Sequence, residues 1–387
     1  YGDHRDLHLS LRRQRQMCIR DRFTNASVTN SICAPSRAVI LTGKHSHING
    51  KIDNIAKFDD SQMTFPQLFK KNGYQTAMFG KLHFGNNPKG IDDFLILPGQ
   101  GDYINPKFLG KNKDTIITGY VTDVITDLTL DWFKNIRVKN KPFLTFYLHK
   151  APHRAWWPSP EKFAEFYNKK FPEPETLFDD YSNRGTAAKT QEMLIAADEK
   201  QIAEAHGKGG HGRWGHDFKM LTDPYGNDTG FERELERFNP AQKQAWLNAY
   251  TPKNDIMRSQ NLQGNKLALW KFNRYIKDYL RTIQSVDDGV GEVLDYLDQE
   301  GLTENTIVVY TSDQGFYLGE HGWFDKRFMY EESLKTPILM RFPKEIPAGS
   351  VVNKMIQNLD FAPTFLDYAG LEKPKDMQGN SFRGIVS

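Results

Sequence analysis

From Phe23 to the end of the chain, short apolar runs alternate with stretches whose apolar residues recur at helical spacing. Three of the runs have the length and the β-branched or aromatic content of buried strands. They are residues 75–79, 143–148 and 306–310. A longer amphipathic pattern over residues 265–300 predicts one long helix, which Gly289 and Gly291 would bend or relax. This alternation is typical of an α/β fold with a mostly parallel central sheet and helices on both faces.

The segment 155–263 interrupts the alternation with a polar, aromatic-rich sequence that contains several prolines. We interpret it as an insertion of surface loops and short helices within a single domain over residues 23–387. Loops of this length near strand ends usually shape a substrate pocket. Three histidines of its Gly-rich loop match no zinc-binding spacing, and we expect them to be solvated. They are His206, His211 and His216.

The first 22 residues differ from the rest in both pattern and charge. Residues 1–22 lack helical and strand periodicity and the apolar core of a secretory signal, and their end resembles translated sequencing-adapter text. They contain six Arg and three Asp, so their own net charge is +3. This is the formal net charge of the whole chain, and the charges of the other residues therefore cancel. We expect this tract to be non-native or disordered. Because residues 23–387 have no net charge, the sequence gives no support for a nucleic-acid or anionic-membrane partner.

Composition narrows the class of protein further. No run of about 18 consecutive apolar residues occurs, which argues against a membrane span. The chain has only 2 Cys, which argues against a disulfide scaffold. We therefore expect a globular protein.

Each of the three predicted strands is followed directly by charged or metal-competent residues. The sequence GKLH follows the first strand at residues 80–83, HKAPH follows the second at 149–153, and TSDQG follows the third at 311–315. In open α/β sheets, ligands bind beyond the carboxyl ends of the strands. The three junctions are therefore expected to converge on one pocket.

The segment SICAPSRAVILTG, residues 31–43, carries the most specific chemistry. Pro35 suits the first turn of a helix that would end at Gly43, which places Cys33 at the helix N-terminus with Arg37 one turn along. A helix N-terminus and a guanidinium both favour a bound anion. A lone buried cysteine is the bland alternative. A cysteine-dependent phosphatase is excluded, because its loop needs five residues between Cys and Arg and this chain has three.

This segment matches the pattern C-x-P-S-R-x-x-x-L-T-G at every fixed position, and here the chain resembles the type I, formylglycine-dependent sulfatases. The motifs GKLH, APH, TSDQG, GEHG, DKRFMYE and DFAPTFLDYAG follow in family order. The resemblance extends from Phe23 nearly to the C-terminus and implies the alkaline-phosphatase-like fold. Arg154 and the paired Trp156 and Trp157 after the APH motif look most like N-acetylglucosamine-6-sulfatases.

The resemblance implies that Cys33 is oxidised to formylglycine by a maturation enzyme. One hydroxyl of the hydrated aldehyde would attack sulfur, and deprotonation of the second would expel the sulfate. Arg37 would hold this hydrate, and His83 would hydrogen-bond it as base or orienter. Lys81 and Lys326 would bind sulfate oxygens.

The remaining site residues implied by the resemblance concern the leaving group, the substrate and a metal. His153 would protonate the leaving alcohol. The expected substrate contacts are His149, Arg154 and His321. The expected ligands of a calcium ion are Asp313, Gln314 and residue 33 itself, because hard ions prefer oxygen ligands.

The chain departs from the family pattern at both ends. Members of the family begin with a central strand that ends in a pair of Asp residues, and they continue into a smaller antiparallel sheet. Neither is recognisable here, so we expect the first strand and the C-terminal small sheet to be missing. Without that strand the calcium site would be weak and sheet edges would be unpaired. We therefore expect residues 1–387 alone to be aggregation-prone and inactive.

The complete parent is expected to be an active sulfatase, periplasmic or extracellular, that removes O-sulfate from a sugar. The expected substrate is 6-O-sulfo-N-acetylglucosamine of mucin or glycosaminoglycan, because aromatic platforms and basic groups suit a sulfated sugar ring. Two alternatives stay open. One is a phosphonate or phosphate monoester hydrolase of the same superfold, and the other is a non-catalytic carbohydrate-binding relative.

Overall fold

The computed structural model describes residues 21–195, 217–221 and 229–386. The chain divides into two compact units. The first comprises residues 1–150, 287–316 and 326–387, and the second comprises residues 151–286 and 317–325. Residues 1–20 of the predicted disordered tract and the three Gly-rich-loop histidines lie outside the described residues. No helix within the described ranges is both long and apolar enough to cross a bilayer.

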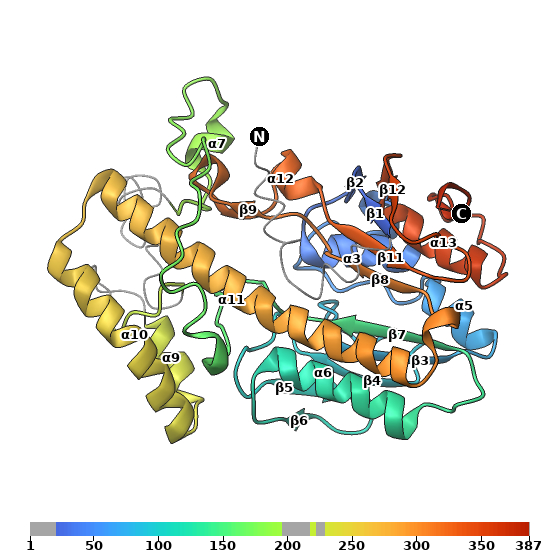
Figure 1. The fold of residues 1–387 in the computed structure, drawn as a ribbon. Coiled ribbons are helices and arrows are strands. Elements are labelled where there is room, and N and C mark those ends of the chain that lie inside the picture. The colour runs from blue at the N-terminus through green and yellow to red at the C-terminus, as the bar shows by residue number, and fades with distance from the viewer. Residues whose placement is uncertain (1–20, 196–216, 222–228, 387) are drawn as a thin grey trace. The chain divides into compact units, whose positions relative to one another are not determined.

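A five-stranded sheet forms one part of the first unit, with strand order β6-β5-β4-β3-β7 (Figure 1). Its strands are β3 (Gln75–Lys81), β4 (Asp93–Leu97), β5 (Lys107–Gly110), β6 (Thr115–Ile116) and β7 (Phe143–Leu148). β3 pairs in parallel with both β4 and β7, whereas β5 and β6 add antiparallel strands at the far edge. The parallel core predicted from the apolar runs is therefore confirmed around β3.

Gly80 of β3 lies beside Leu148 at the end of β7. Its φ of 102° lies in a region that side chains rarely adopt, and a Cβ there would lie 1.9 Å from the carbonyl oxygen of Leu148. Only glycine fits this position without moving the backbone. It brings the end of β3, and with it Lys81, close to the end of β7.

A four-stranded mixed sheet has the order β12-β1-β11-β8. Its strands are β1 (Asp21–Phe23), β8 (Val308–Thr311), β11 (Ile338–Arg341) and β12 (Ser350–Val352). β1 runs parallel to β12 and antiparallel to β11. Its pairing with β12 begins at Asp21, two residues before Phe23, where the folded domain was expected to begin. A short ladder joins β2 (Ala26–Ser27) to β13 (Ile356–Gln357). Within the described residues, β7 and β8 each pair on one side only.

Six α-helices among the described residues belong wholly to the first unit. They are α3 (Cys33–Thr42), α4 (Ser46–Asn49), α5 (Phe65–Lys71), α6 (Val121–Asp131), α12 (Glu331–Leu334) and α13 (Phe361–Tyr368). A buried apolar cluster joins α3, α5 and α13 to β3 and β4 through side chains such as Ala38, Phe65, Met78 and Leu366. This packing anchors α3, the helix that carries the cysteine motif.

The long helix α11 (Gly264–Gln299) is continuous and contributes residues to both units. The predicted bend at Gly289 does not interrupt it. Instead, a Cβ on Gly289 would lie 2.4 Å from Thr126 Oγ1 and 2.6 Å from Tyr147 Oη. The glycine thus allows close packing of α11 against α6 and β7 rather than a change of direction.

The second unit contains further α-helices and two short strands within its described residues. They are α7 (Thr186–Thr190), α9 (Gly230–Glu236), α10 (Pro240–Gln260), β9 (Tyr317–Leu318) and β10 (Phe324–Asp325). Trp157, Trp246 and Tyr250 are fully buried together, with Trp157 and Trp246 ring centroids 4.8 Å apart. The predicted insertion 155–263 therefore contains the 21-residue helix α10, which Asn239 caps. Trp156 and Trp157 are buried in this unit and do not form an exposed platform.

Candidate functional site

Cys33 lies at the N-terminus of α3, as the motif predicted, and is 1% exposed. Ile32 before it is extended, and the helix ends at Gly43, whose φ of 63° forms a left-handed C-cap. The amide of Ala34 donates to Asn54 Oδ1 at 3.1 Å. The helix start therefore holds the sulfur in a fixed, buried position.

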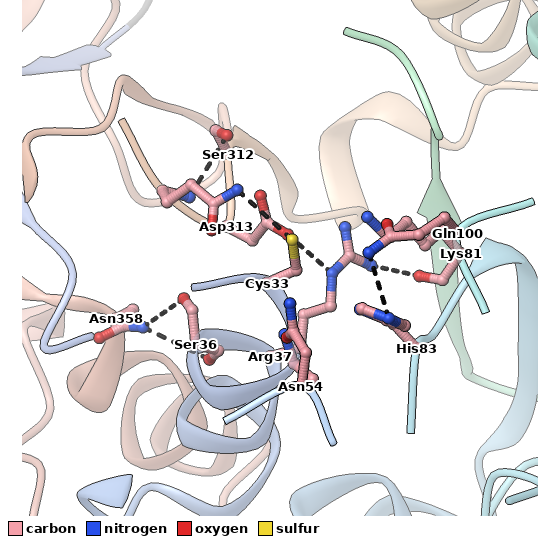
Figure 2. A network of polar contacts seen from close by, with 12 residues as sticks. Cys33, Ser36, Arg37, Asn54, Lys81, His83, Gln100, Ser312, Asp313 and Asn358 are labelled. Atoms are coloured by element: carbon pink, nitrogen blue, oxygen red, sulfur yellow. Dashed lines mark hydrogen bonds and ion pairs between the residues drawn. The ribbon is translucent and has the colours of Figure 1, made fainter. Parts of the chain in front are cut away.

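Arg37 connects α3 to the ends of two strands (Figure 2). Its Nε donates to Asp313 Oδ2 at 2.8 Å, and its Nη1 donates to the carbonyl oxygen of Lys81. Lys81 ends β3, and Asp313 follows β8. Two of the three predicted strand ends thus meet at the cysteine motif.

Buried positive charge surrounds the sulfur. Burial by itself would raise the pKa of Cys33, but Lys81, Lys326 and a hydrogen bond with His83 hold that pKa well below its usual value. Burial lowers the pKa of Lys81 to about 8. Lys81 and Lys326 are 2% and 1% exposed. The site favours a negatively charged group beside residue 33.

Asp313 supplies the opposite charge in this cluster. Burial would raise the pKa of its carboxyl group, but Arg37, Lys81 and Lys326 lower it. Asp313 is therefore ionised, and it offsets part of the charge of the three cations.

His83 follows β3 with a φ of 68°, and its Nε2 lies 3.3 Å from Gln100 Nε2. Burial lowers the pKa of His83, although the hydrogen bond with Cys33 opposes this shift. Gln100 sits between Gly99 and Gly101, both with positive φ, in the turn after β4. Sequence reasoning missed Gln100. Its signal was the glycine pair directly behind a strand.

The loop after β8 is held by close backbone packing. Gln314 Nε2 donates to the Cys33 sulfur at 3.7 Å. The amide of Gly315 donates to the carbonyl of Ser333 at 2.8 Å, and a Cβ on Gly315 would lie 2.2–2.8 Å from three backbone carbonyls. Glycine at this position thus sets the path that brings Gln314 to the sulfur.

Two further polar residues hold the motif, and no sequence pattern pointed to them. Ser333 Oγ donates to Ser31 Oγ at 2.8 Å and accepts from the amide of Arg327 at 2.9 Å. Asn358 Nδ2 donates to Ser36 Oγ at 2.8 Å (Figure 2). These contacts link the start of α3 to segments near residues 327 and 358.

The described residues only partly fit the calcium ion that the family resemblance implies. Among the residues that the structure describes, none hydrogen-bonds to the buried Oε1 of Gln314, which suits a hard cation, but Asp313 Oδ2 already accepts from Arg37. Over the described ranges, no three His, Cys, Asp or Glu side chains form a metal-binding group. Calcium prefers 6–8 oxygens. These residues therefore do not complete a calcium site by themselves.

His149, one of the expected substrate contacts, follows β7 in the first unit, and both nitrogens of its ring are buried. Its ring makes an edge-on contact with Tyr147, with centroids 4.3 Å apart. Neither ring nitrogen has a hydrogen-bond partner in the part of the chain that the structure describes. Burial lowers the pKa of His149 to about 3, so its imidazole is neutral near neutral pH. Substrate contact by His149 stays a prediction.

The other predicted residues belong to the second unit, where each has protein partners. His153 Nδ1 lies 2.8 Å from the carbonyl oxygen of Arg154. Arg154 pairs with Asp217 at 2.9 Å, and its guanidinium lies 4.3 Å from the ring centroid of Phe324. Substrate contact by Arg154 stays a prediction.

His321 lies in a polar network of its own. Its Nδ1 lies 2.9 Å from Asp179 Oδ2, and Asp179 also accepts from Arg184 at 2.8 Å. Tyr181 donates its hydroxyl to the carbonyl oxygen of His321 at 2.5 Å. These contacts fix the ring, and its predicted role toward substrate is untested.

Comparison with known proteins places the chain among the sulfatases. Residues 21–371 match the family model described as Sulfatase. The chain is 46% identical over 371 residues to an N-acetylglucosamine-6-O-sulfatase of Bacteroides thetaiotaomicron, covering 94% of this chain and 64% of that protein. It is 25% identical to the N-acetylglucosamine-6-sulfatase of Homo sapiens, covering 94% of this chain and 58% of that protein. The chain thus spans less than two thirds of either relative.

Solved structures give the same picture for the fold. One, of a protein in complex with its substrate D-glucosamine-2-N,6-O-disulfate, is 44% identical with a TM-score of 0.88, covering 97% of this chain and 74% of that one. A phosphonate monoester hydrolase from Silicibacter pomeroyi is 18% identical with a TM-score of 0.65, covering 100% of this chain and 73% of that one. The predicted alkaline-phosphatase-like α/β fold is confirmed.

Proposed function

Because this chain belongs to the sulfatase family, we propose that it hydrolyses an O-sulfate ester with residue 33 at the reacting centre. The observation that carries this proposal is the charge around the sulfur. Lys81, Lys326 and Arg37 are arranged about one helix N-terminus, with Asp313 as their acidic partner. Such a site stabilises negative charge that develops on a transferring sulfuryl group.

Residue 33 is the proposed position of formylglycine, made from Cys33 by a maturation enzyme. When present, this group supplies the oxygen nucleophile. The protein's own side chains then have separate tasks. Lys81 and Lys326 bind the sulfate oxygens, Arg37 orients residue 33, and His83 holds or accepts a proton there.

His153 is the proposed acid for the leaving alcohol. A backbone carbonyl only accepts hydrogen bonds, so the contact with the Arg154 carbonyl places a proton on Nδ1 of His153. Nε2 is then the nitrogen that exchanges a proton with the leaving group. A sugar alkoxide leaves poorly, so this proton transfer has a large effect on its rate.

The proposed substrate is a 6-O-sulfated N-acetylglucosamine unit of mucin or glycosaminoglycan. Two similarities support it: the 46% identical relative is an N-acetylglucosamine-6-O-sulfatase, and the 44% identical solved structure is a complex with a 6-O-sulfated glucosamine. The proposed location is periplasmic or extracellular, where such glycans occur. Fractionation of cells that produce the protein tests the location.

The test uses the full-length protein carrying this chain, made in a host with the maturation system. Mass spectrometry of the peptide containing residue 33 should show an aldehyde in place of the thiol. We expect hydrolysis of 6-O-sulfo-N-acetylglucosamine, no hydrolysis by Cys33→Ala, and faster turnover of 4-nitrophenyl sulfate than of phenylphosphonate. Preference for a 2-O-sulfated uronate would contradict the proposed sugar substrate. Preference for the phosphonate would contradict the proposal that the reaction is sulfate ester hydrolysis.

A modified but inactive protein that still binds the sulfated sugar would favour the carbohydrate-binding alternative. In the full-length protein, Asp313, Gln314 and residue 33 would supply part of the oxygen ligands of a calcium ion, and other ligands would have to complete its shell. Asp313→Asn and Gln314→Leu should each reduce the rise in melting temperature that calcium produces. An unchanged rise in both variants would contradict this assignment.

A further inference from the structure

Lys219 is a fully buried lysine that the proposed reaction does not use. It is 0% exposed, and its Nζ donates to the carbonyl oxygens of Ala155, Trp156 and Asp217 and to Asp278 Oδ2, each at 2.9 Å. An ammonium group has three donors, so these four acceptors occupy all of its hydrogen-bonding capacity. A buried charge with this many partners holds their positions relative to one another.

Asp278 on α11 is the fixed end of this arrangement. Its Oδ1 accepts from Tyr250 Oη at 2.9 Å and from Arg281 Nη1 at 2.8 Å, while Oδ2 accepts from Lys219. Burial would raise the pKa of Asp278, but Lys219 and Arg281 lower it to about 2. The carboxylate is ionised and held by three donors, which makes it a rigid anchor.

The two clamped carbonyls belong to the second and third residues after His153. The peptide between them and His153 carries the Arg154 carbonyl, which accepts from His153 Nδ1 at 2.8 Å. Arg154 is itself tied by its Nη2 to Asp217 at 2.9 Å, and the carbonyl of Asp217 is another Lys219 partner. One buried ammonium therefore contacts both the backbone after His153 and the partner of Arg154.

We propose that Lys219, held by Asp278, is a positioning residue for His153. It fixes the loop whose Arg154 carbonyl holds one proton on Nδ1, so that the doubly protonated ring gives its second proton, the one on Nε2, to the leaving group and stays neutral with a proton on Nδ1. All of these residues belong to the second unit. The inference rests on the proposed function, because only a leaving-group acid makes this orientation matter for the rate. Lys219 touches no reacting atom in this account.

The first test compares two sulfate esters with the full-length, matured protein. Lys219→Met keeps the length of the side chain and removes its donors. Hydrolysis of 6-O-sulfo-N-acetylglucosamine should fall by about 10²-fold in kcat, the size of a lost acid contribution. Hydrolysis of 4-nitrophenyl sulfate should change by less than about threefold, because nitrophenolate leaves without a proton. Equal losses with both substrates would overturn the proposal.

The matched control is Lys253→Met in α10. Lys253 lies 5.1 Å from the Tyr167 ring centroid and 5.4 Å from that of Tyr250. We expect this variant to hydrolyse both esters as the wild type does.

If Lys219→Met does not fold, Asp278→Asn is the second variant. It should give the same selective loss, because a neutral amide anchors the ammonium less strongly.

A spectroscopic readout separates this proposal from the proposed function. In protein labelled with ¹⁵N-histidine, and with His153 assigned through His153→Gln, the neutral ring should carry its proton on Nδ1. Lys219→Met should shift the signal toward a mixture of tautomers. A wild-type proton on Nε2, or an unchanged tautomer in folded Lys219→Met, would overturn the positioning role. Wild-type protein that hydrolyses neither ester would refute the proposed function, and the tautomer would still decide the role of Lys219.

Discussion

The Nε of Arg37 donates to Asp313 Oδ2 at 2.8 Å, although the two residues are 276 positions apart in the chain. The contact joins the first turn of α3 to the loop after β8. Both side chains are largely buried, at 14% and 15% exposure. It is the link that makes the cysteine motif and the TSDQG motif one site.

This ion pair predicts a large loss of stability when one partner is removed. Asp313→Ala would leave Arg37, Lys81 and Lys326 without their acidic partner. We expect it to lower the free energy of unfolding by about 3 kcal/mol, as for other broken buried pairs. Urea titration measures the change. Asp60→Ala is the control, because Asp60 pairs with Lys89 at an exposed position and should cost less than about 1 kcal/mol.

His149 predicts a dependence of stability on pH. Burial lowers the pKa of the folded imidazole to about 3. Between about pH 6.5 and pH 3 the unfolded chain therefore binds a proton that the folded chain does not, so stability falls as pH decreases. From pH 7 to pH 5 the contribution is about 2 kcal/mol.

The His149→Phe variant should lose that part of the pH dependence in urea titrations at several pH values. The control is His47→Gln, which removes a histidine that is exposed. This variant should keep the wild-type dependence of stability on pH. An identical slope in His149→Phe would mean that other groups cause the acid sensitivity.

Gly315 predicts a steric effect in the loop that carries Gln314. A Cβ at this position would meet the carbonyl oxygens of Glu332, Ser333 and Lys335. Gly315→Ala should lower the free energy of unfolding by about 2–3 kcal/mol, because backbone must move. Gly384→Ala has no atom within 4 Å of the added Cβ and should change stability by less than about 0.5 kcal/mol. Similar effects of the two substitutions would contradict this account.

The buried cations predict that inorganic sulfate binds the folded protein. Sulfate should raise the melting temperature, and Lys81→Met and Lys326→Met should each weaken its apparent affinity by about tenfold or more. Thermal melts at increasing sulfate concentration measure this without requiring turnover. Lys70→Met removes an exposed cation that pairs with Asp92 and should leave the sulfate effect unchanged. Equal sulfate protection in all variants would place the anion elsewhere.

Local sequence patterns were sufficient to predict the helices and strands whose positions depend on residues close together in the chain. The Pro35 and Gly43 signals located both ends of α3, and the apolar runs located β3 and β7, because capping and strand propensity act over a few residues. The family resemblance is confirmed by the match over residues 21–371.

Contacts between distant segments were not predictable in this way. Ser333 and Asn358 hydrogen-bond to Ser31 and Ser36. Serine and asparagine are usually exposed in proteins, so nothing in the sequence indicated these buried contacts. Trp156 and Trp157 indicated a sugar platform, but both side chains are buried, because side-chain type does not say which face is covered.

The order of residues established the chemistry available: a cysteine at a helix start, an arginine one turn later, and polar motifs directly after apolar strands. Packing decided which of these groups meet. Arg37 reaches Asp313, Gln314 reaches the sulfur, and Lys219 reaches the loop after His153 only once segments far apart in the chain are folded together. The physical reason is that helix and strand signals are local energies, whereas burial, charge pairing and pKa depend on all the atoms around a group.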